Sequence, residues 1–248
     1  MDRRQLLKTM GGSAIGAAIG AGLLGCSPAA GAAAPAGPPS DILPLADWWL
    51  TLPTGSPDAT IVKDLAGYQA DPWFVGQDDG VRFRANVGGA TTSGSAYPRC
   101  ELRELNPDRT QASWSFRAGT HEMDVTLAVT AAPVRKPEVC LAQVHGTSGD
   151  LLIVYYDAKA GGIRWKLESV AQPKVVDYAP GRPLNVRIRV ADGRCEVFLD
   201  GTRRIDFVSD HATCYFKTGA YVLSNPSKGD DPAAYGETVM SRLAVVHT

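Results

Sequence analysis

The feature that most constrains the fold of this 248-residue chain is a strict alternation of apolar and polar residues in several short segments. Because side chains i and i+2 share one face of a β-strand, this alternation predicts strands with one buried face. The clearest segments are residues 122–129, 185–190 and 195–200. Residues 151–156 are uninterruptedly apolar, which is typical of a strand that is buried on both faces.

Turn signals separate these segments at short intervals. Asp-Gly pairs occur at 79–80, 192–193 and 200–201, where glycine readily adopts the positive φ of a hairpin turn. No long stretch has the 3.6-residue periodicity of a helix. Many short strands joined by turns predict an all-β fold, a β-sandwich or jelly roll of two antiparallel sheets.

The first forty residues have the composition of an export segment. Arg3-Arg4 precede an apolar run from Met10 to Leu24, which predicts a twin-arginine signal peptide over residues 1–25. The sequence Leu-Leu-Gly before Cys26 resembles a lipoprotein cleavage box, so we expect Cys26 to carry a lipid. The alternative is an ordinary secretory signal that contains a cysteine. Residues 26–40, rich in Ala, Pro and Gly, predict a disordered tether.

These features predict an exported protein, either a cell-envelope lipoprotein or a periplasmic or extracellular protein, that contacts a membrane only through Cys26. Residues 41–248 suffice for one domain. The formal net charge of −1 gives no reason to expect nucleic acid binding. We expect a monomer that needs no cofactor or metal. His121, His211 and His247 show no pattern of partners and no zinc-like spacing.

Four cysteines remain in the predicted mature domain: Cys100, Cys140, Cys195 and Cys214. An even number in an exported protein permits disulfides. Strand parity places Cys195 and Cys214 on the apolar side of what we expect to be neighbouring strands, so this is the favoured pair. Four buried free thiols, acting as small apolar side chains, are the alternative.

Three other segments gather polar, reactive side chains on one strand face. Arg99, Glu101 and Arg103 alternate with apolar neighbours, as do Gln143 and His145. The third segment, residues 215–221, places Tyr215, Lys217 and Tyr221 together. Each residue alone has an ordinary structural explanation, such as a surface ion pair or a hydrogen-bonded core histidine. Their shared face parity favours instead a cationic groove for an acidic sugar polymer.

These segments resemble the motifs of the polysaccharide lyase family 7 alginate lyases: Arg-x-Glu-Leu-Arg, Gln-(Ile/Val)-His and Tyr-Phe-Lys-Ala-Gly-x-Tyr, in this order. Residues 91–98 and 49–53 also look like the family. The chain departs from the pattern at Cys100, at Thr218 and at Leu223, which stands where many members have Gln. The resemblance implies a lectin-like jelly roll with a concave substrate cleft and cleavage of alginate.

The residue types suit β-elimination from a 4-linked uronate. Arg99 and Gln143 can neutralise the carboxylate next to C5 and stabilise the enolate-like intermediate. His145 can remove the C5 proton near neutral pH. Tyr221 can protonate the leaving O4, and it can act as the base for the opposite C5 configuration if cationic neighbours lower its pKa.

The remaining polar residues of the segments complete the expected site. Arg103 and Lys217 would bind neighbouring carboxylates, Glu101 would orient the arginines, and Tyr215 would contact substrate. Val144 between Gln143 and His145 accompanies a preference for mannuronate in the family, with glucuronan as an alternative polymer. Two other classes stay open: a non-catalytic carbohydrate-binding module, and a structural envelope lipoprotein.

Overall fold

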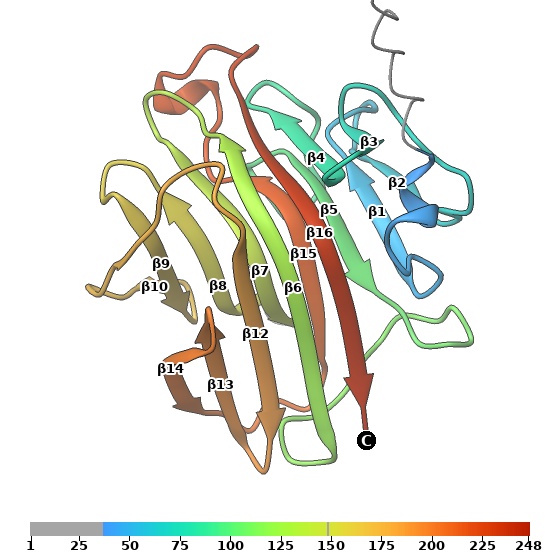
Figure 1. Ribbon diagram of the computed structural model, residues 1–248, viewed down its shortest axis with the longest axis vertical. Helices are drawn as coiled ribbons and strands as arrows, with labels where there is room; N and C mark the ends of the chain where they lie inside the picture. The colour runs from blue at the N-terminus through green and yellow to red at the C-terminus, as the bar shows by residue number, and fades with distance from the viewer. Residues whose placement is uncertain (1–36, 148) are drawn as a thin grey trace, which may run out of the picture. The chain divides into compact units, whose positions relative to one another are not determined.

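A computed structural model of the protein describes residues 37–147 and 149–248 (Figure 1). The predicted signal peptide, Cys26 and most of the expected tether lie outside the described residues. Pro39–Asp41 forms a short 3-10 helix, η1, in which Pro39 is buried. The first two residues of η1 belong to the segment that we expected to be a tether, so regular structure begins slightly earlier than the sequence indicated.

Two antiparallel sheets face each other and confirm the predicted all-β sandwich (Figure 1). Sheet A has the order β10-β9-β8-β7-β15-β5-β1-β2, with β11 paired to β9. Its strands are β1 (Trp48–Leu52), β2 (Thr60–Val62), β5 (Arg99–Glu104), β7 (Glu138–Gly146), β8 (Gly149–Asp157), β9 (Gly162–Leu167), β10 (Val170–Ala171), β11 (Val176–Asp177) and β15 (Cys214–Val222).

Sheet B has the order β14-β13-β12-β6-β16-β4-β3. Its strands are β3 (Phe74–Gln77), β4 (Gly80–Asn86), β6 (Thr120–Ala131), β12 (Leu184–Ala191), β13 (Arg194–Leu199), β14 (Thr202–Val208) and β16 (Tyr235–His247). A second 3-10 turn, η2 (Pro226–Lys228), precedes β16. In the part of the chain that the structure describes, no helix is long and apolar enough to cross a membrane.

The core lies between the two sheets and is built by the alternating segments. In β6, Met123, Val125 and Leu127 are buried while their neighbours are half-buried, as the period of two requires. The apolar run in β8 is buried at every position. One face of β8 joins the main core, and Ile153 and Tyr155 form a small second cluster on the opposite face.

The predicted hairpins are present. Asp192-Gly193 joins β12 to β13, and Asp200-Gly201 joins β13 to β14. All four residues have positive φ, between 48° and 76°. This is the backbone conformation of a two-residue turn whose twist matches that of the flanking strands.

The predicted pairing of Cys195 with Cys214 is wrong. All four cysteines of the described residues are buried free thiols. Cys195 lies on β13 of sheet B and Cys214 on β15 of sheet A, so the two strands are not neighbours. The two thiols instead lie on facing sheets as separate members of the core. Burial raises the pKa of Cys214 to about 11, which keeps its thiol protonated and unreactive.

Gly219 allows β15 to approach β5 closely. The pairing of β15 with β7 is irregular between Thr218 and Tyr221, and Gly219 has φ of 141°. A Cβ at this position would lie 2.6 Å from the carbonyl oxygen of Cys100. The glycine therefore permits the close approach of β15 to β5 at the irregularity that lies between Lys217 and Tyr221.

We predict that Gly219→Ala lowers the free energy of unfolding by about 1–3 kcal/mol, because the new methyl group meets backbone in a φ region that favours glycine. Urea unfolding measures the change. Gly94→Ala, where a Cβ meets open space, is the matched control and should leave stability nearly unchanged. Equal stability of Gly219→Ala and wild type would contradict this account of the irregularity.

Candidate active site

The three motif strands are adjacent in sheet A, in the order β7-β15-β5. Their register aligns the polar residues across the outer face, which is the face directed away from sheet B. The aligned pairs are Tyr215 with His145, Lys217 with Gln143, Lys217 with Arg103, and Tyr221 with Arg99. All eight candidate residues of the site are therefore brought together by three neighbouring strands. Between them the apolar positions Cys100 and Phe216 face the core, as parity predicted.

Glu101 is the centre of this group, and only 1% of its surface is exposed. Its carboxylate accepts hydrogen bonds from Arg99 (Nη1 to Oε2, 3.0 Å), from Lys217 (Nζ to Oε2, 2.5 Å) and from the amide of Gln143. Burial opposes ionisation, but the charges of Lys217 and Arg99 outweigh it and hold the pKa of Glu101 below its ordinary value. Glu101 is an ionised anchor that reaches a substrate only through these three partners.

Arg99 is held between Glu101 and an aromatic ring. Its guanidinium carbon lies 3.8 Å from the ring centroid of Tyr221, a cation–π contact. Only 7% of the surface of Arg99 is exposed, yet its Nε has no hydrogen-bond partner among the described residues. A buried donor without a partner costs free energy.

His145 is oriented by its own strand end. Its Nδ1 lies 2.7 Å from the carbonyl oxygen of Gly146 and 3.0 Å from the hydroxyl of Tyr215. Because a carbonyl only accepts, Nδ1 carries the proton and Nε2 presents a free lone pair. Burial, and next the charge of Lys217, lower the pKa of His145 from its ordinary value. The imidazole is thus neutral at neutral pH and able to accept a proton.

The pKa of Tyr221 is raised, whereas that of His145 is lowered, so the phenol keeps its proton. Burial raises its pKa, and the charge of Arg99 and a hydrogen bond with Ser95 (Oη to Oγ, 3.1 Å) only partly offset that effect. The cationic neighbour that we expected is present, but burial outweighs it and the phenol stays protonated. No sequence motif assigns a role to Ser95, and its only signal was its place in the family-like segment 91–98.

Two other predicted substrate-binding residues, Arg103 and Tyr215, stack beside His145. Arg103 lies with its guanidinium carbon 4.0 Å from the ring centroid of Tyr215, and it donates to the carbonyl oxygen of Glu104 (2.9 Å) rather than to Glu101. Tyr215 is stacked on His145 with ring centroids 5.1 Å apart. Glu101 therefore orients one of the two arginines, and Arg103 is oriented by Tyr215 and the end of β5.

An apolar wall borders the polar group on the outer face. It is formed by Cys140, Ile153, Tyr155 and Leu223, with Tyr97 and Tyr221 packed against it. Leu223, which replaces a glutamine found in many members of the family, is buried in this wall. Within residues 37–147 and 149–248, no group of three or more His, Cys, Asp or Glu side chains is arranged to hold a metal ion.

Comparison with known proteins agrees with this geometry. The family described as Alginate lyase matches residues 43–247 of the chain. AlgAT5, an alginate lyase from polysaccharide lyase family 7, shares 36% identity and a TM-score of 0.80, over 85% of this chain and 99% of its own. The alginate lyase of Corynebacterium sp. shares 32% identity and a TM-score of 0.81, over 87% of this chain and 100% of its own.

A third solved structure, the family 7 alginate lyase A1-II′ with product GGG, shares 26% identity and a TM-score of 0.72, over 86% of this chain and 100% of its own. No curated protein sequence matches the chain significantly. The jelly-roll fold and these matches define a polysaccharide lyase. The chain belongs to the alginate lyase family, polysaccharide lyase family 7. This assignment sets aside the two non-enzymatic alternatives.

We predict that Lys217→Met raises the pKa of His145, because the substitution removes a positive charge that opposes protonation of the imidazole. An NMR titration of the His145 ring measures the pKa in both proteins. Lys228→Met, which changes a lysine of η2, is the control and should not move the pKa of His145. An unchanged or lowered pKa in Lys217→Met would contradict the electrostatic coupling.

Proposed function

We propose that this enzyme cleaves 4-linked uronate polysaccharide by β-elimination and leaves an unsaturated uronate at the new non-reducing end. The observation that carries the proposal is the pair of opposite proton states on one face: a neutral His145 with a free Nε2 and a protonated Tyr221. A base and an acid of this kind are what the removal of one proton and the delivery of another require.

In the proposed reaction, His145 Nε2 takes the proton from C5 of the uronate. The electron pair moves toward the carboxylate, whose added negative charge is stabilised by the positive charge of the Arg99 guanidinium and by the Gln143 amide. The C4–O4 bond then breaks, the C4=C5 double bond forms, and Tyr221 gives its proton to the leaving O4. Glu101 keeps Arg99 and Gln143 in place throughout.

A row of aligned residues across sheet A supports an acidic polymer as substrate. Register places Trp49, Arg103, Lys217, Gln143, Ile153 and Lys166 side by side on successive strands. The ammonium of Lys63 lies 4.9 Å from the ring centroid of Trp49 at one end of the row. Cations thus extend on both sides of the reacting centre, as binding of several consecutive carboxylates requires.

The polymer that we propose is alginate that contains mannuronate. Alginate is supported by the relative A1-II′, whose solved structures hold product GGG and substrate GGMG. The preference for mannuronate is supported only by Val144 between Gln143 and His145, a side chain that is buried in the core and acts through packing.

We expect ultraviolet absorbance from the conjugated double bond to rise when the enzyme acts on polymannuronate, and less or not at all on polyguluronate and glucuronan. His145→Ala and Tyr221→Phe should each lower kcat about 10²–10⁴-fold, because each removes one proton transfer. Tyr235→Phe, on sheet B beneath Arg84, and His211→Ala are matched controls that should keep activity.

Three results would separate the alternatives. Reducing ends that appear without absorbance would indicate hydrolysis and refute β-elimination. Binding of a polymer without any product would refute catalysis by this site. A rise on polyguluronate or glucuronan alone would refute the preference for mannuronate and leave the reaction type intact.

A further inference from the structure

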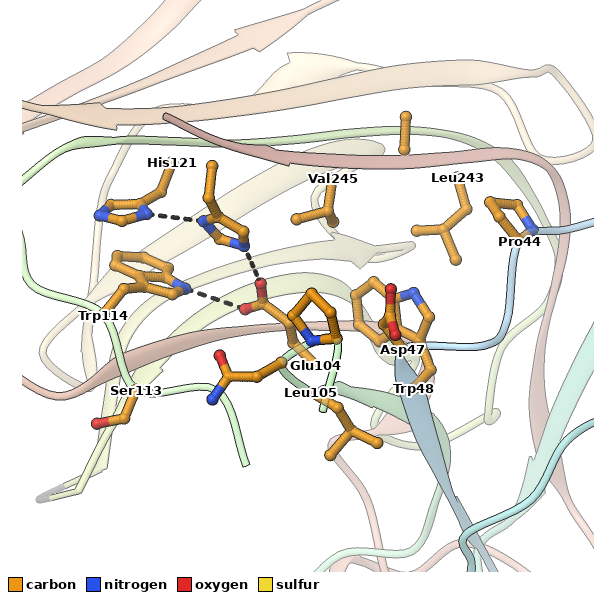
Figure 2. Close-up of a pocket in the computed structure, with 14 residues that line it drawn as sticks. Pro44, Asp47, Trp48, Glu104, Leu105, Ser113, Trp114, His121, Leu243 and Val245 are labelled. Atoms are coloured by element: carbon orange, nitrogen blue, oxygen red, sulfur yellow. Dashed lines mark hydrogen bonds and ion pairs between the residues drawn. The ribbon is translucent and has the colours of Figure 1, made fainter. Parts of the chain in front are cut away.

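A second cluster of titratable side chains lies behind the proposed site, between the two sheets. It lines a cavity of about 660 Å³ (Figure 2). Trp48 and Glu104 come from sheet A, His121 and His247 come from sheet B, and Trp114 comes from the connection between β5 and β6. None of these residues has a role in the reaction described above.

Glu104 is the acceptor at the centre of this cluster, and only 2% of its surface is exposed. Its Oε2 accepts from the indole N–H of Trp114 (3.0 Å) and from the backbone N–H of Phe216 (2.7 Å). Its Oε1 lies 2.5 Å from Nε2 of His247. Figure 2 shows the bond from the indole of Trp114 to the carboxylate of Glu104. Three donors on two oxygens fit an ionised carboxylate.

The bond to Phe216 links this cluster to the proposed site. The last aligned pair of β15 and β5 is Lys217 with Arg103. Phe216 directly precedes Lys217 on β15. Its backbone N–H donates to the side chain of Glu104, the last residue of β5. Phe216 lies between Tyr215 and Lys217, whose side chains project from the opposite face of the strand. Glu104 therefore fixes the backbone that carries both.

The histidines determine how the charge of Glu104 is balanced. Nε2 of His121 lies 2.8 Å from the carbonyl oxygen of Ala118, and Nε2 of His247 faces Glu104, so both Nε2 atoms must carry protons. The two Nδ1 atoms are 2.7 Å apart. Two bare lone pairs at this distance would repel each other, and two N–H groups would collide. One proton must lie between them, which gives the pair three protons on four nitrogens.

We propose that His121 and His247 share this single proton as an imidazole–imidazolium pair, and that the pair and Glu104 together act as a positioning element for Tyr215 and Lys217. The single positive charge of the pair balances the buried carboxylate. The effect on catalysis rests on the proposed function, whereas the shared proton does not.

The arrangement has a defined response to acid. Burial lowers the pKa of His121, and the charge of His247 lowers it further, so the pair accepts a second proton only below the ordinary histidine value of about 6.5. The other acids near the pair are Glu104 and, on the cavity wall, Asp47. Two charged imidazoles would repel each other and break the Nδ1 contact between His121 on β6 and His247 on β16.

The sign of the stability change follows from linkage. Between pH of about 6.5 and the lowered pKa of His121, the unfolded chain binds more protons than the folded chain. The free energy of unfolding therefore has its full value, as far as His121 is concerned, above a pH of about 6.5. It decreases as the pH falls from there toward the lowered pKa of His121. His121→Asn should reduce this acid-dependent loss, and His211→Asn, a histidine outside the cluster, should retain it.

The decisive measurement is ¹H and ¹⁵N NMR of the histidine rings in the full-length protein without substrate. We expect one strongly deshielded proton that correlates with both Nδ1 atoms, absent from His121→Asn and His247→Asn and present in His211→Asn. Two neutral imidazoles, or two independent imidazolium rings, at neutral pH would overturn the proposal. Because no substrate is used, this result does not depend on whether the enzyme cleaves alginate.

The positioning role is tested on the polymer that the wild type cleaves. Glu104→Ala should lower kcat about 10- to 100-fold with a smaller change in KM, because Tyr215 and Lys217 are displaced rather than removed. Glu104→Gln, whose carbonyl can still accept from Phe216, should recover part of that loss. Equal kcat in wild type and Glu104→Ala would overturn the positioning role. If Glu104→Ala does not fold, Glu104→Gln and His247→Asn provide the same comparison.

Discussion

The buried carboxylate of Glu101 is the interaction on which the outer face of sheet A depends. A charge that is almost wholly removed from water is stable only when it is paired and hydrogen-bonded. Its three partners, Arg99, Gln143 and Lys217, come from β5, β7 and β15. One anion thus requires three strands to keep their register, and that register is what places His145 and Tyr221 on the same face.

β5 carries a second buried carboxylate three residues later, and the two act on opposite faces of the same strand. Glu101 holds the side chain of Lys217 on the outer face, and Glu104 holds the backbone of Phe216 from the interior. β15 is therefore fixed from both sides at neighbouring positions. Rigid support of this kind matters for a reaction in which a base and an acid must meet one sugar ring in a defined geometry.

Much of this site was predictable because strand parity is a local property. The motif residues, their common face and the core-facing positions of Cys100 and Phe216 followed from a period of two along the chain. The pairing of Cys195 with Cys214 was wrong because parity gives the face of a strand and not the sheet to which it belongs. Ser95 was missed for a similar reason: its contact with Tyr221 joins residues 126 positions apart.

The amino-acid sequence by itself determined the strands, their buried faces, the hairpin turns and the chemical identity of the reactive groups, since these depend on neighbours a few residues away. Only the tertiary structure decided which strands are adjacent, and with them the proton states. His145 is neutral and Tyr221 protonated because burial and the charges of Lys217 and Arg99 act together on them. The bond between His247 and Glu104 likewise exists only because two sheets face each other, and no local pattern in the sequence predicts it.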